Sequence, residues 1–412
     1  MSNPFTSDIF VTTWMKHFKN SQIPQSVEWI EGLRFVKHRY FPFYVNVGKN
    51  LTKGVSYSVN AKVNDFEGKT LLVYDVPTYF NRETIPEGSH LKLKKVFQYQ
   101  GFLMDLTKSI STEAYINSQF SSKNRREFRS NERRLHECFS ASHRFFYKDI
   151  SKEDYNFIFD SFYELLSARF SGKNTNYHHL EPQKWNYYKD LVYPMIKAKK
   201  ASFLVIYDEK TPIGITLNFH SESVLFETIT VFDTNYSKFS IGKLAIIKLL
   251  DFCYAHKISM SDFSKGDFDY KRKWGNTVYD FNYHILYDAS SVKSKLTAFC
   301  LERFFKAKLY LREKEVNQWY RKMRFKFARS SKAKYNWGDF KIEKLEEFHP
   351  DSTYKAINFK ASEYKGLLYV VYSFLFYAPQ SVDTVKVYQN INDVNVYVIS
   401  GDKKAQKVIF NH

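Results

Sequence analysis

The sequence contains few cysteines, glycines and prolines for its length. Its 412 residues include 3 Cys, 14 Gly and 10 Pro, a composition that excludes disulfide-rich scaffolds and argues against long disordered or repetitive segments. The cysteines, Cys138, Cys253 and Cys300, lie far apart and outside any Cys/His cluster, so no metal site is expected. Free thiols of this kind are typical of a reducing compartment.

Long apolar runs are also missing. The best candidate, 366–378, is shorter than the roughly 20 residues that a membrane-spanning helix needs. Residues 1–18 lack the basic start, apolar centre and small-residue cleavage site of a secretory signal. We therefore expect a cytoplasmic protein, and its charge leaves a membrane-peripheral position open.

Positive charge is abundant and clustered. The formal net charge is +19 at pH 7, which attracts phosphates, nucleic acid or an anionic membrane. Basic residues concentrate in 123–134 and in 303–334, and the second segment pairs them with an apolar stripe. That combination suits an anionic membrane surface or RNA. Docking of the same helix onto the rest of the protein is the alternative.

The length and composition predict two or three globular domains with a large core, because 44% of residues are hydrophobic and 18% aromatic. Short strand-like runs separated by polar turns predict a strand-rich region over 1–118. Alternating strands and helices follow over 119–290. A basic helix and a strand-rich extension make up 291–412. In that extension the expected strands are 369–376, 384–388 and 395–399.

The region 201–287 shows the clearest pattern of elements. A helix from 242 to 256 is expected between the strands 224–232 and 258–263. A hairpin precedes this unit and another strand follows it, at 278–287. This order is typical of an α+β fold with one crossover helix between neighbouring strands.

Several short motifs follow one another in this region. They are Ser240-Ile241-Gly242-Lys243, Asp262-Phe263, Gly266-Asp267, Tyr270-Lys271 and Trp274. With the basic helix 123–135, they resemble the GNAT-type domain of CelD/BcsL-like acyltransferases, which reads Ser-Pro-Gly at the start of its crossover helix. The resemblance covers about 101–290 and more faintly the N-terminal region. It implies a GNAT-like mixed sheet flanked by helices, and a double-GNAT arrangement if the N-terminal region takes part.

The resemblance also implies a donor and an acceptor. GNAT enzymes use acyl-CoA, most simply acetyl-CoA, and CelD/BcsL-like enzymes suggest a sugar of a surface polysaccharide as acceptor. Fem-type ligases, which take aminoacyl groups from tRNA, share the architecture and a similar aromatic-Lys motif. Ile241 replaces the usual Pro, and the loop lacks the Gln/Arg-x-x-Gly-x-Gly phosphate signature of ordinary GNAT enzymes. The choice between acyl-CoA and aminoacyl-tRNA therefore stays open.

The start of the crossover helix is the expected carrier site. A helix N-terminus offers unpaired N–H groups and a partial positive charge, both of which suit a pyrophosphate. Gly242 lets the backbone of Ile241 and its neighbours approach a phosphate, and Ser240 can cap the helix or contact the anion. Lys238 and Lys243 add charge. A plain capped helix without a ligand is the alternative.

Three side chains are candidates for the chemistry of acyl transfer. Asp262, at the end of a core strand, could orient an acceptor or take its proton, with Lys271 as its counter-ion. Lys271 could instead stabilise an oxyanion or a phosphate. Glu227 is a second candidate base, because a Glu in an apolar strand must face water or a polar pocket. A structural Asp–Lys pair and a solvent-facing Glu are the alternatives.

The remaining predicted residues would bind substrate. Tyr270 and Trp274 would form a wall of the site, and Arg125, Arg129 and Arg133 would line a groove for an anionic carrier or substrate. A solvated helix face held by charge pairs, such as Arg129 with Glu132, is the alternative.

Two classes of function follow from these patterns. The first is an acyltransferase that acts on an amine or hydroxyl of a small-molecule or saccharide acceptor. The second is a non-catalytic basic protein that binds nucleic acid or an anionic membrane. The pair His178-His179, in a polar loop, is expected at the surface rather than at a metal.

Overall fold

Strands from the first 288 residues form one sheet. The computed structural model describes residues 3–19, 21–60, 63, 65–80, 84–85, 87–171, 177–314 and 339–410. The mixed sheet is twelve-stranded, and β4 (Ser58–Val59) pairs with β2 beside the main path. The main path runs β1 (Gln25–Val27), β2 (Ile30–Lys37), β3 (Tyr44–Asn46), β5 (Thr70–Pro77), β12 (Thr277–Asp288), β6 (Leu91–Asp105), β11 (Met260–Lys265), β10 (Val224–Phe232), β9 (Thr211–His220), β8 (Ala201–Asp208), β7 (Ala141–Phe146).

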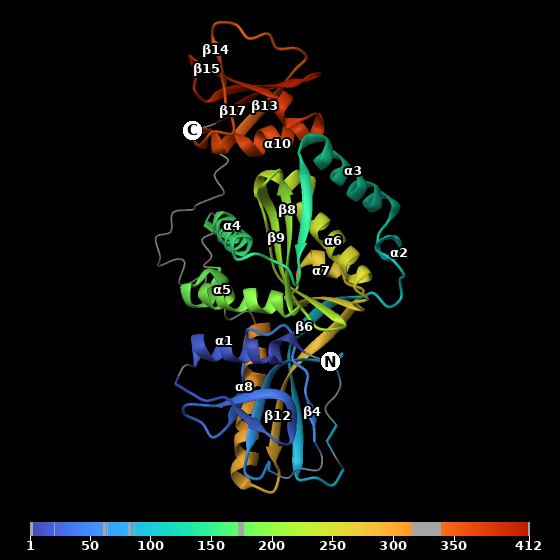
Figure 1. Ribbon diagram of the computed structural model, residues 1–412, viewed down its shortest axis with the longest axis vertical. Helices are drawn as coiled ribbons and strands as arrows, with labels where there is room; N and C mark the ends of the chain where they lie inside the picture. Colours follow the sequence, from blue (N-terminus) through green and yellow to red (C-terminus); the bar gives the residue numbers. More distant parts are fainter. Residues whose placement is uncertain are drawn as a thin grey trace.

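β6 and β12 connect the two halves of this sheet. They pair antiparallel from Thr277 with Leu103 to Asp288 with Leu91. On its other edge, β6 pairs antiparallel with β11. β12 also pairs with β5 of the N-terminal region. The regions 1–118 and 119–290 therefore share one sheet, and Figure 1 shows the N-terminal strands below the central ones along the long axis of the molecule.

The helices cover both faces of the sheet. They are α1 (Asp8–Phe18), α2 (Thr112–Gln119), α3 (Ser122–Cys138), α4 (Lys152–Ser171), α5 (Pro182–Lys197), α6 (Ile241–Ala255), α7 (Asp269–Trp274), α8 (Val292–Glu313) and α10 (Leu368–Tyr377). One buried cluster unites α1, α4 and α5 with the strands, and another unites α2, α3, α6 and α10. Serine side chains cap the starts of α2 and α4: Ser111 accepts from the N–H of Ala114 at 3.1 Å, and Ser151 from that of Asp154 at 2.9 Å.

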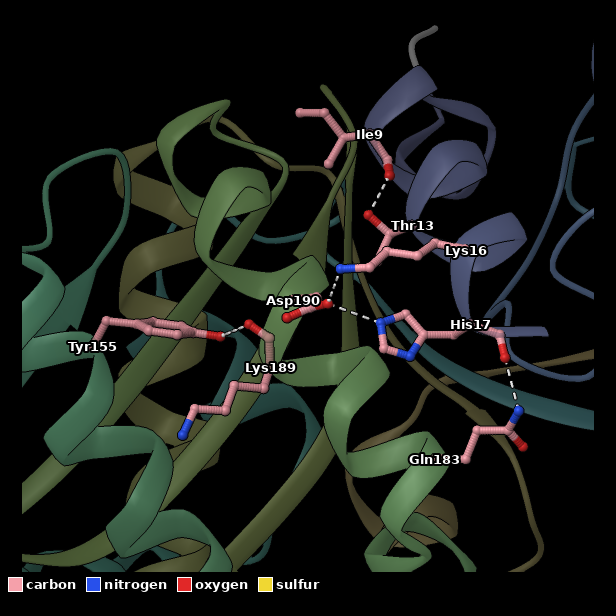
Figure 2. Close-up of polar contacts among 8 residues, drawn as sticks. All are labelled: Ile9, Thr13, Lys16, His17, Tyr155, Gln183, Lys189 and Asp190. Atoms are coloured by element: carbon pink, nitrogen blue, oxygen red, sulfur yellow. Dashed lines mark hydrogen bonds and ion pairs between the residues drawn. The ribbon is translucent and has the colours of Figure 1, made fainter. Parts of the chain in front are cut away.

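Polar contacts hold α1 against α5. Asp190 of α5 accepts hydrogen bonds from Lys16 Nζ at 2.8 Å and pairs with His17 Nε2 at 2.9 Å (Figure 2). Gln183 Nε2 donates to the carbonyl of His17 at 2.7 Å. Tyr155 of α4 in turn donates to a carbonyl of α5 at 2.7 Å. The N-terminal helix is therefore fixed against α5, and α5 is in turn tied to α4.

A separate antiparallel sheet follows in the C-terminal region. Its five strands run in the order β13 (Phe340–Leu345), β17 (Ala405–Phe410), β16 (Val396–Ser400), β15 (Lys386–Asn390) and β14 (Tyr354–Ile357). Tyr372 of α10 packs against Phe139 at 4.9 Å and against Tyr236 at 4.7 Å between ring centroids. Tyr236 belongs to η3 (Thr234–Phe239), the 3-10 helix that leads into α6. The C-terminal module, defined as residues 339–410, thus supports the start of α6.

Two expectations for this region need correction or restriction. The segment 369–376, expected as a strand, belongs to the helix α10. The expectation was wrong because a short run of apolar residues has too few polar positions to distinguish the period of a strand from that of a helix. The strands expected at 384–388 and 395–399 correspond to β15 and β16. Of the basic helix expected over 303–334, α8 accounts for the part up to Glu313, and 315–338 lies outside the described residues. Among the described helices, none has the length and apolar character to cross a bilayer.

Candidate active site

The parallel strands β10 and β11 separate after three paired residues. Val224–Phe226 pair with Met260–Asp262, and the two strands share no further paired residues. α6 connects the end of β10 to the start of β11 and lies on one face of both. Beyond Phe226 and Asp262, the facing edges of the two strands have no strand partner. This opening is the centre of the candidate site.

The first turn of α6 presents backbone N–H groups at one end of this opening. Ser240 adopts φ +58°, and its carbonyl accepts from the N–H of Lys243 at 2.8 Å and of Leu244 at 3.1 Å. The N–H groups of Ile241 and Gly242 precede these bonds and have no acceptor within the helix. The Ser240 hydroxyl accepts from Asn131 Nδ2 at 3.0 Å and does not cap α6. The helix start is therefore available to an anion.

A cavity of about 650 Å³ lies against this helix start. It brings together residues that the sequence placed in different motifs, namely Glu227, Ser240, Gly242, Lys243, Tyr270 and Trp274. A Cβ on Gly242 would lie 3.2 Å from the ring of Phe232, so the glycine keeps this end of the cavity open.

The other predicted carrier residues take different positions. Lys243 lines the cavity, and its ammonium pairs with Glu127 of α3 at 2.6 Å. Lys238 points to the C-terminal module, where Nζ donates to Tyr377 Oη at 3.4 Å. The side chain of Ile241 is buried in the core, so only its backbone faces the helix start.

The three arginines expected to bind substrate do not line the cavity. Arg125 donates to the carbonyls of Asn117 and Phe120 at the end of α2. Arg133 pairs with Glu137 at 3.5 Å, and Arg129 is exposed. α3 contributes other residues to the cavity wall, among them Asn124, Glu127 and Phe128. The geometry thus favours the solvated-face interpretation of these arginines.

A second cavity, of about 990 Å³, adjoins the first. The two share Arg169, Glu227, Thr230 and Tyr270 in their walls. The second is formed by both halves of the sheet, because α1, the loop 49–53, α5 and the end of β11 all contribute. We call the first the carrier cavity and the second the acceptor-side cavity.

Glu227 lies at the junction of the two cavities. It stands at a register shift in β10, directly after the last residue that pairs with β11. Its side chain is largely buried, and Oε1 accepts a hydrogen bond from Ser261 Oγ at 3.0 Å. Burial raises the pKa of Glu227 to about 8, although the Ser261 hydrogen bond and the Lys271 charge oppose the rise. The carboxyl is therefore poised to exchange a proton near neutral pH.

Asp262 is fully buried and lines neither cavity. Its carboxylate accepts hydrogen bonds from Tyr79 Oη at 2.8 Å, from Tyr279 Oη at 2.6 Å and from the N–H of Ser264 at 2.6 Å. Burial raises its pKa to about 6. These contacts tie β11 to β12 and to the segment after β5, which makes Asp262 a structural anchor behind the site.

Lys271 binds backbone rather than a carboxylate. Nζ donates to the carbonyls of Phe263 at 2.7 Å, Ser264 at 3.3 Å and Lys265 at 2.5 Å. The expected ion pair with Asp262 is absent, although both residues belong to the described part of the chain. Burial lowers the pKa of Lys271 to about 8. Lys271 closes the end of β11, where the strand has left β10.

The two predicted wall aromatics differ in burial. Trp274 is buried, stacks on Phe128 at 5.5 Å and contacts Phe120 at 4.6 Å between ring centroids. Tyr270 lines both cavities and remains half exposed. Its ring meets Phe263 edge-on at 5.7 Å. Trp274 thus shapes the carrier cavity, and Tyr270 separates it from the acceptor-side cavity.

Several residues of the site carried no recognisable signal in the sequence. Arg169, on α4, lines both cavities and lies 4.7 Å over the ring of Phe232. Ser261 is one of four consecutive buried residues of β11, and only its hydrogen bond to Glu227 gives it a role. His178 and His179, expected at the surface, line the acceptor-side cavity, and His179 is largely buried. Among the described residues, no cluster of three His, Cys, Asp or Glu side chains has the arrangement of a metal site.

Comparison with known proteins agrees with this architecture. Residues 122–272 match the family described as acetyltransferase (GNAT) domain. The match spans α3 through β11 and most of α7, and it confirms the mixed α+β, GNAT-like fold expected from the sequence. It also supports an acyltransferase that uses acyl-CoA. No curated protein sequence matches the chain.

Solved structures with a similar arrangement have low sequence identity to this chain. A conserved protein of unknown function from Bacteroides thetaiotaomicron is 9% identical, with a TM-score of 0.43, over 69% of this chain and 92% of that chain. L-PGS from Bacillus licheniformis is 12% identical, with a TM-score of 0.42, over 71% and 91%. FemX is 10% identical, with a TM-score of 0.43, over 66% and 90%.

Proposed function

We propose that this protein transfers an acyl group from acyl-CoA, most simply acetyl-CoA, to an amine or hydroxyl of an acceptor. The observation that carries the proposal is the position of Glu227 at the junction of two cavities. One cavity opens onto the free N–H groups of α6, and the other is large enough for a separate molecule. Donor and acceptor can therefore meet at a buried carboxylate.

The carrier cavity suits the phosphates of an acyl-CoA. The N–H groups of Ile241 and Gly242 would receive a phosphate, and the partial positive charge of the helix start would favour it. Lys243 stands beside them, although its charge is partly satisfied by Glu127. The opening between β10 and β11 would then lead the acyl end toward Glu227.

In the reaction, Glu227 acts as the general base. Its carboxylate accepts the proton of the acceptor N–H or O–H while the nitrogen or oxygen bonds to the acyl carbon. The carbon–sulfur bond then breaks, and its electron pair leaves with the sulfur as a thiolate that takes up a proton. A pKa of about 8 matches this task, because the carboxyl can both take and release a proton near neutral pH.

Asp262 and Lys271 would act as positioning residues in this mechanism. Asp262 fixes β11 through two tyrosines, and Lys271 fixes the end of β11 through three carbonyls. Both affect the charge on Glu227 through space, since Lys271 lowers the pKa of Glu227 and Asp262 raises it. For the acceptor, we propose a sugar of a surface polysaccharide, supported by the motifs shared with CelD/BcsL-like enzymes.

Binding of the donor can be tested by calorimetry with acetyl-CoA, free CoA and tRNA. We expect acetyl-CoA and CoA to bind the wild-type protein, and Gly242→Trp to abolish that binding, because the indole would fill the cavity beside Phe232. Gly366→Trp is the matched control, since that glycine has open space around it and lies outside the site. Binding of tRNA without binding of CoA would replace the donor by aminoacyl-tRNA, and unchanged CoA binding in Gly242→Trp would refute the carrier site.

We also propose that α8 rests on an anionic membrane surface. Val292, Leu296 and Phe299 lie at helical spacing on one side and are 78%, 62% and 48% exposed. The opposite side is buried against the sheet through Ala298 and Phe305. Lysines and arginines flank the exposed apolar stripe along the helix. Apolar side chains among basic ones are typical of helices that lie in a membrane interface.

A further inference from the structure

The acceptor-side cavity carries an excess of positive charge at its wall. Its six basic residues are Lys49, Lys53, Arg169, Lys184, Lys265 and Lys271. Among the residues described along the same wall, Glu227 is the only carboxylate. Most of the other lining residues are aromatic or apolar, so few groups there can neutralise the charge.

The protein itself compensates only part of this charge. Lys184 pairs with Glu181 at 3.0 Å, and the ammonium of Lys271 is occupied by carbonyls. Lys265 lies 5.1 Å over the ring of Tyr99. Lys53 forms no hydrogen bond or ion pair with any residue that the structure describes. At least two ammonium groups therefore face this region without a carboxylate partner.

Burial and mutual repulsion lower the pKa values of basic groups in this cavity. Burial first, and then the charges of Lys265 and Lys271, lower the pKa of Lys53 to about 7, although the charges of Asp75 and Asp262 oppose the fall. Burial and the charges of Lys53 and other lysines likewise lower the pKa of His179 to about 2, which keeps that imidazole neutral. A site that concentrates cations at such a cost in stability is typical of ligand binding rather than of packing.

The geometry points to an anionic acceptor: a molecule that carries a phosphate or carboxylate, held by Lys53 and Lys265, together with the amine or hydroxyl that is acylated at Glu227. This inference rests on the proposed function and adds the substrate class. The anion would lie toward the N-terminal half of the cavity, where the loop 49–53 contributes its wall. The reactive group would lie toward Tyr270 and Glu227, where the cavities meet.

The test is calorimetric binding of glucosamine 6-phosphate, glucuronate and glucosamine to the full chain. We expect one or both anions to bind and glucosamine to bind at least about tenfold more weakly. Binding of the phosphate alone would identify a phosphorylated acceptor, and binding of both anions a site that also accepts carboxylates. Equal binding of glucosamine, or no binding of either anion, would overturn the inference.

Variants separate this site from the carrier cavity. Lys53→Met and Lys265→Met should each weaken anion binding at least about tenfold and leave CoA binding intact, whereas Gly242→Trp should do the reverse. Lys210→Met, an exposed lysine in the turn between β8 and β9, is the matched control and should change neither. If the wild-type protein binds the anion but not CoA, the proposed donor is contradicted. If Lys53→Met binds the anion as tightly as wild type, this inference is contradicted.

Proton linkage gives a second readout. An anion beside Lys53 favours the charged ammonium and raises its lowered pKa. Binding at pH 8 should therefore take up protons, which appears as a dependence of the heat of binding on the ionisation enthalpy of the buffer. Lys53→Met should remove most of this uptake. The variant should also unfold at the same or a higher temperature at pH 7, because it removes a buried charge. Proton uptake that persists in Lys53→Met would overturn the role of this lysine.

Discussion

Ser261 Oγ donates a hydrogen bond of 3.0 Å to Glu227 Oε1 at the point where β10 and β11 separate. Ser261 pairs with Leu225, so its hydroxyl reaches the carboxyl two residues further along the neighbouring strand. The bond crosses the opening at its narrow end. This hydrogen bond holds the proposed base, Glu227, in place and stabilises the charged carboxylate. It therefore influences the pH at which the reaction becomes fast.

Replacing this hydroxyl should move the pH profile. The Ser261 hydrogen bond lowers the pKa of Glu227, so Ser261→Ala should raise it, and the rise of kcat/KM with pH should shift to more alkaline values. A hydrogen bond worth about 0.5–1.5 kcal/mol corresponds to roughly a two- to tenfold loss of rate at pH 7, with recovery at high pH. Ser259→Ala, just before β11, is the control. A profile that stays in place would contradict the link between Ser261 and the base.

Removing the base should separate activity from stability. Glu227→Gln keeps the size of the side chain and should lower kcat by about 100-fold or more. Between pH 4.5 and about 8, the folded protein holds a proton at Glu227 that the unfolded chain releases, so this group makes stability fall as pH rises. Glu227→Gln should therefore gain melting temperature over wild type, most of all above pH 8. Glu222→Gln, an exposed residue at the other end of β10, should show neither effect.

Charges behind the site should shift the same profile in opposite directions. Lys271 lowers the pKa of Glu227 and Asp262 raises it. Lys271→Met should therefore move the rise in kcat/KM to higher pH and cut turnover at pH 7 at least about tenfold, or about 1.4 kcal/mol. Asp262→Asn should move the rise to lower pH. Shifts of the same sign in both variants would show that they act by disturbing β11 and not through charge.

Local sequence patterns predicted the elements of the central region well. The strand at 224–232 has the expected bounds, and the helix expected over 242–256 is α6 (Ile241–Ala255). These features depend on residues close in sequence, where hydrophobic period and capping chemistry act directly. The GNAT-like order of elements around α6 followed from the same patterns.

Features that depend on distant residues were not predictable in this way. β6, which joins the two halves of the sheet, is not among the strands expected from the sequence. It lies between β12 and β11, and a strand in such a position depends on its partners more than on its own sequence pattern. The closeness of Lys271 and Asp262 in sequence predicts an ion pair, whereas the irregularity of β11 at Ser264 turns backbone carbonyls toward the ammonium of Lys271. The second cavity, which Glu227 lines, requires chain segments from both halves of the sheet.

Membrane contact of α8 can be measured by co-sedimentation with vesicles. The double change Leu296→Glu and Phe299→Glu should reduce binding to vesicles of phosphatidylcholine with phosphatidylglycerol at least about tenfold, because it replaces apolar side chains worth about 1.5–3 kcal/mol each with negative charges. Ile110→Glu, at an exposed residue on the connection before α2, is the control. Equal binding of wild type and the double variant would exclude this stripe as the contact.

Gly101 and Tyr279 provide the sharpest test of the anchor behind the site. They are paired residues on β6 and β12, and a Cβ on Gly101 would overlap the ring of Tyr279. Gly101→Ala should therefore displace the ring and break its hydrogen bond to Asp262, at a cost of about 1–3 kcal/mol in unfolding free energy.

A double-mutant cycle distinguishes this mechanism from a general effect of adding a methyl group. In a Tyr279→Ala background the ring is gone, so Gly101→Ala should cost almost nothing further, and the two changes should be strongly non-additive. Gly366→Ala, where the added methyl meets open space, is the matched control. Urea denaturation of the four members of the cycle measures the coupling, and additive costs would show that the ring does not depend on the glycine to reach Asp262.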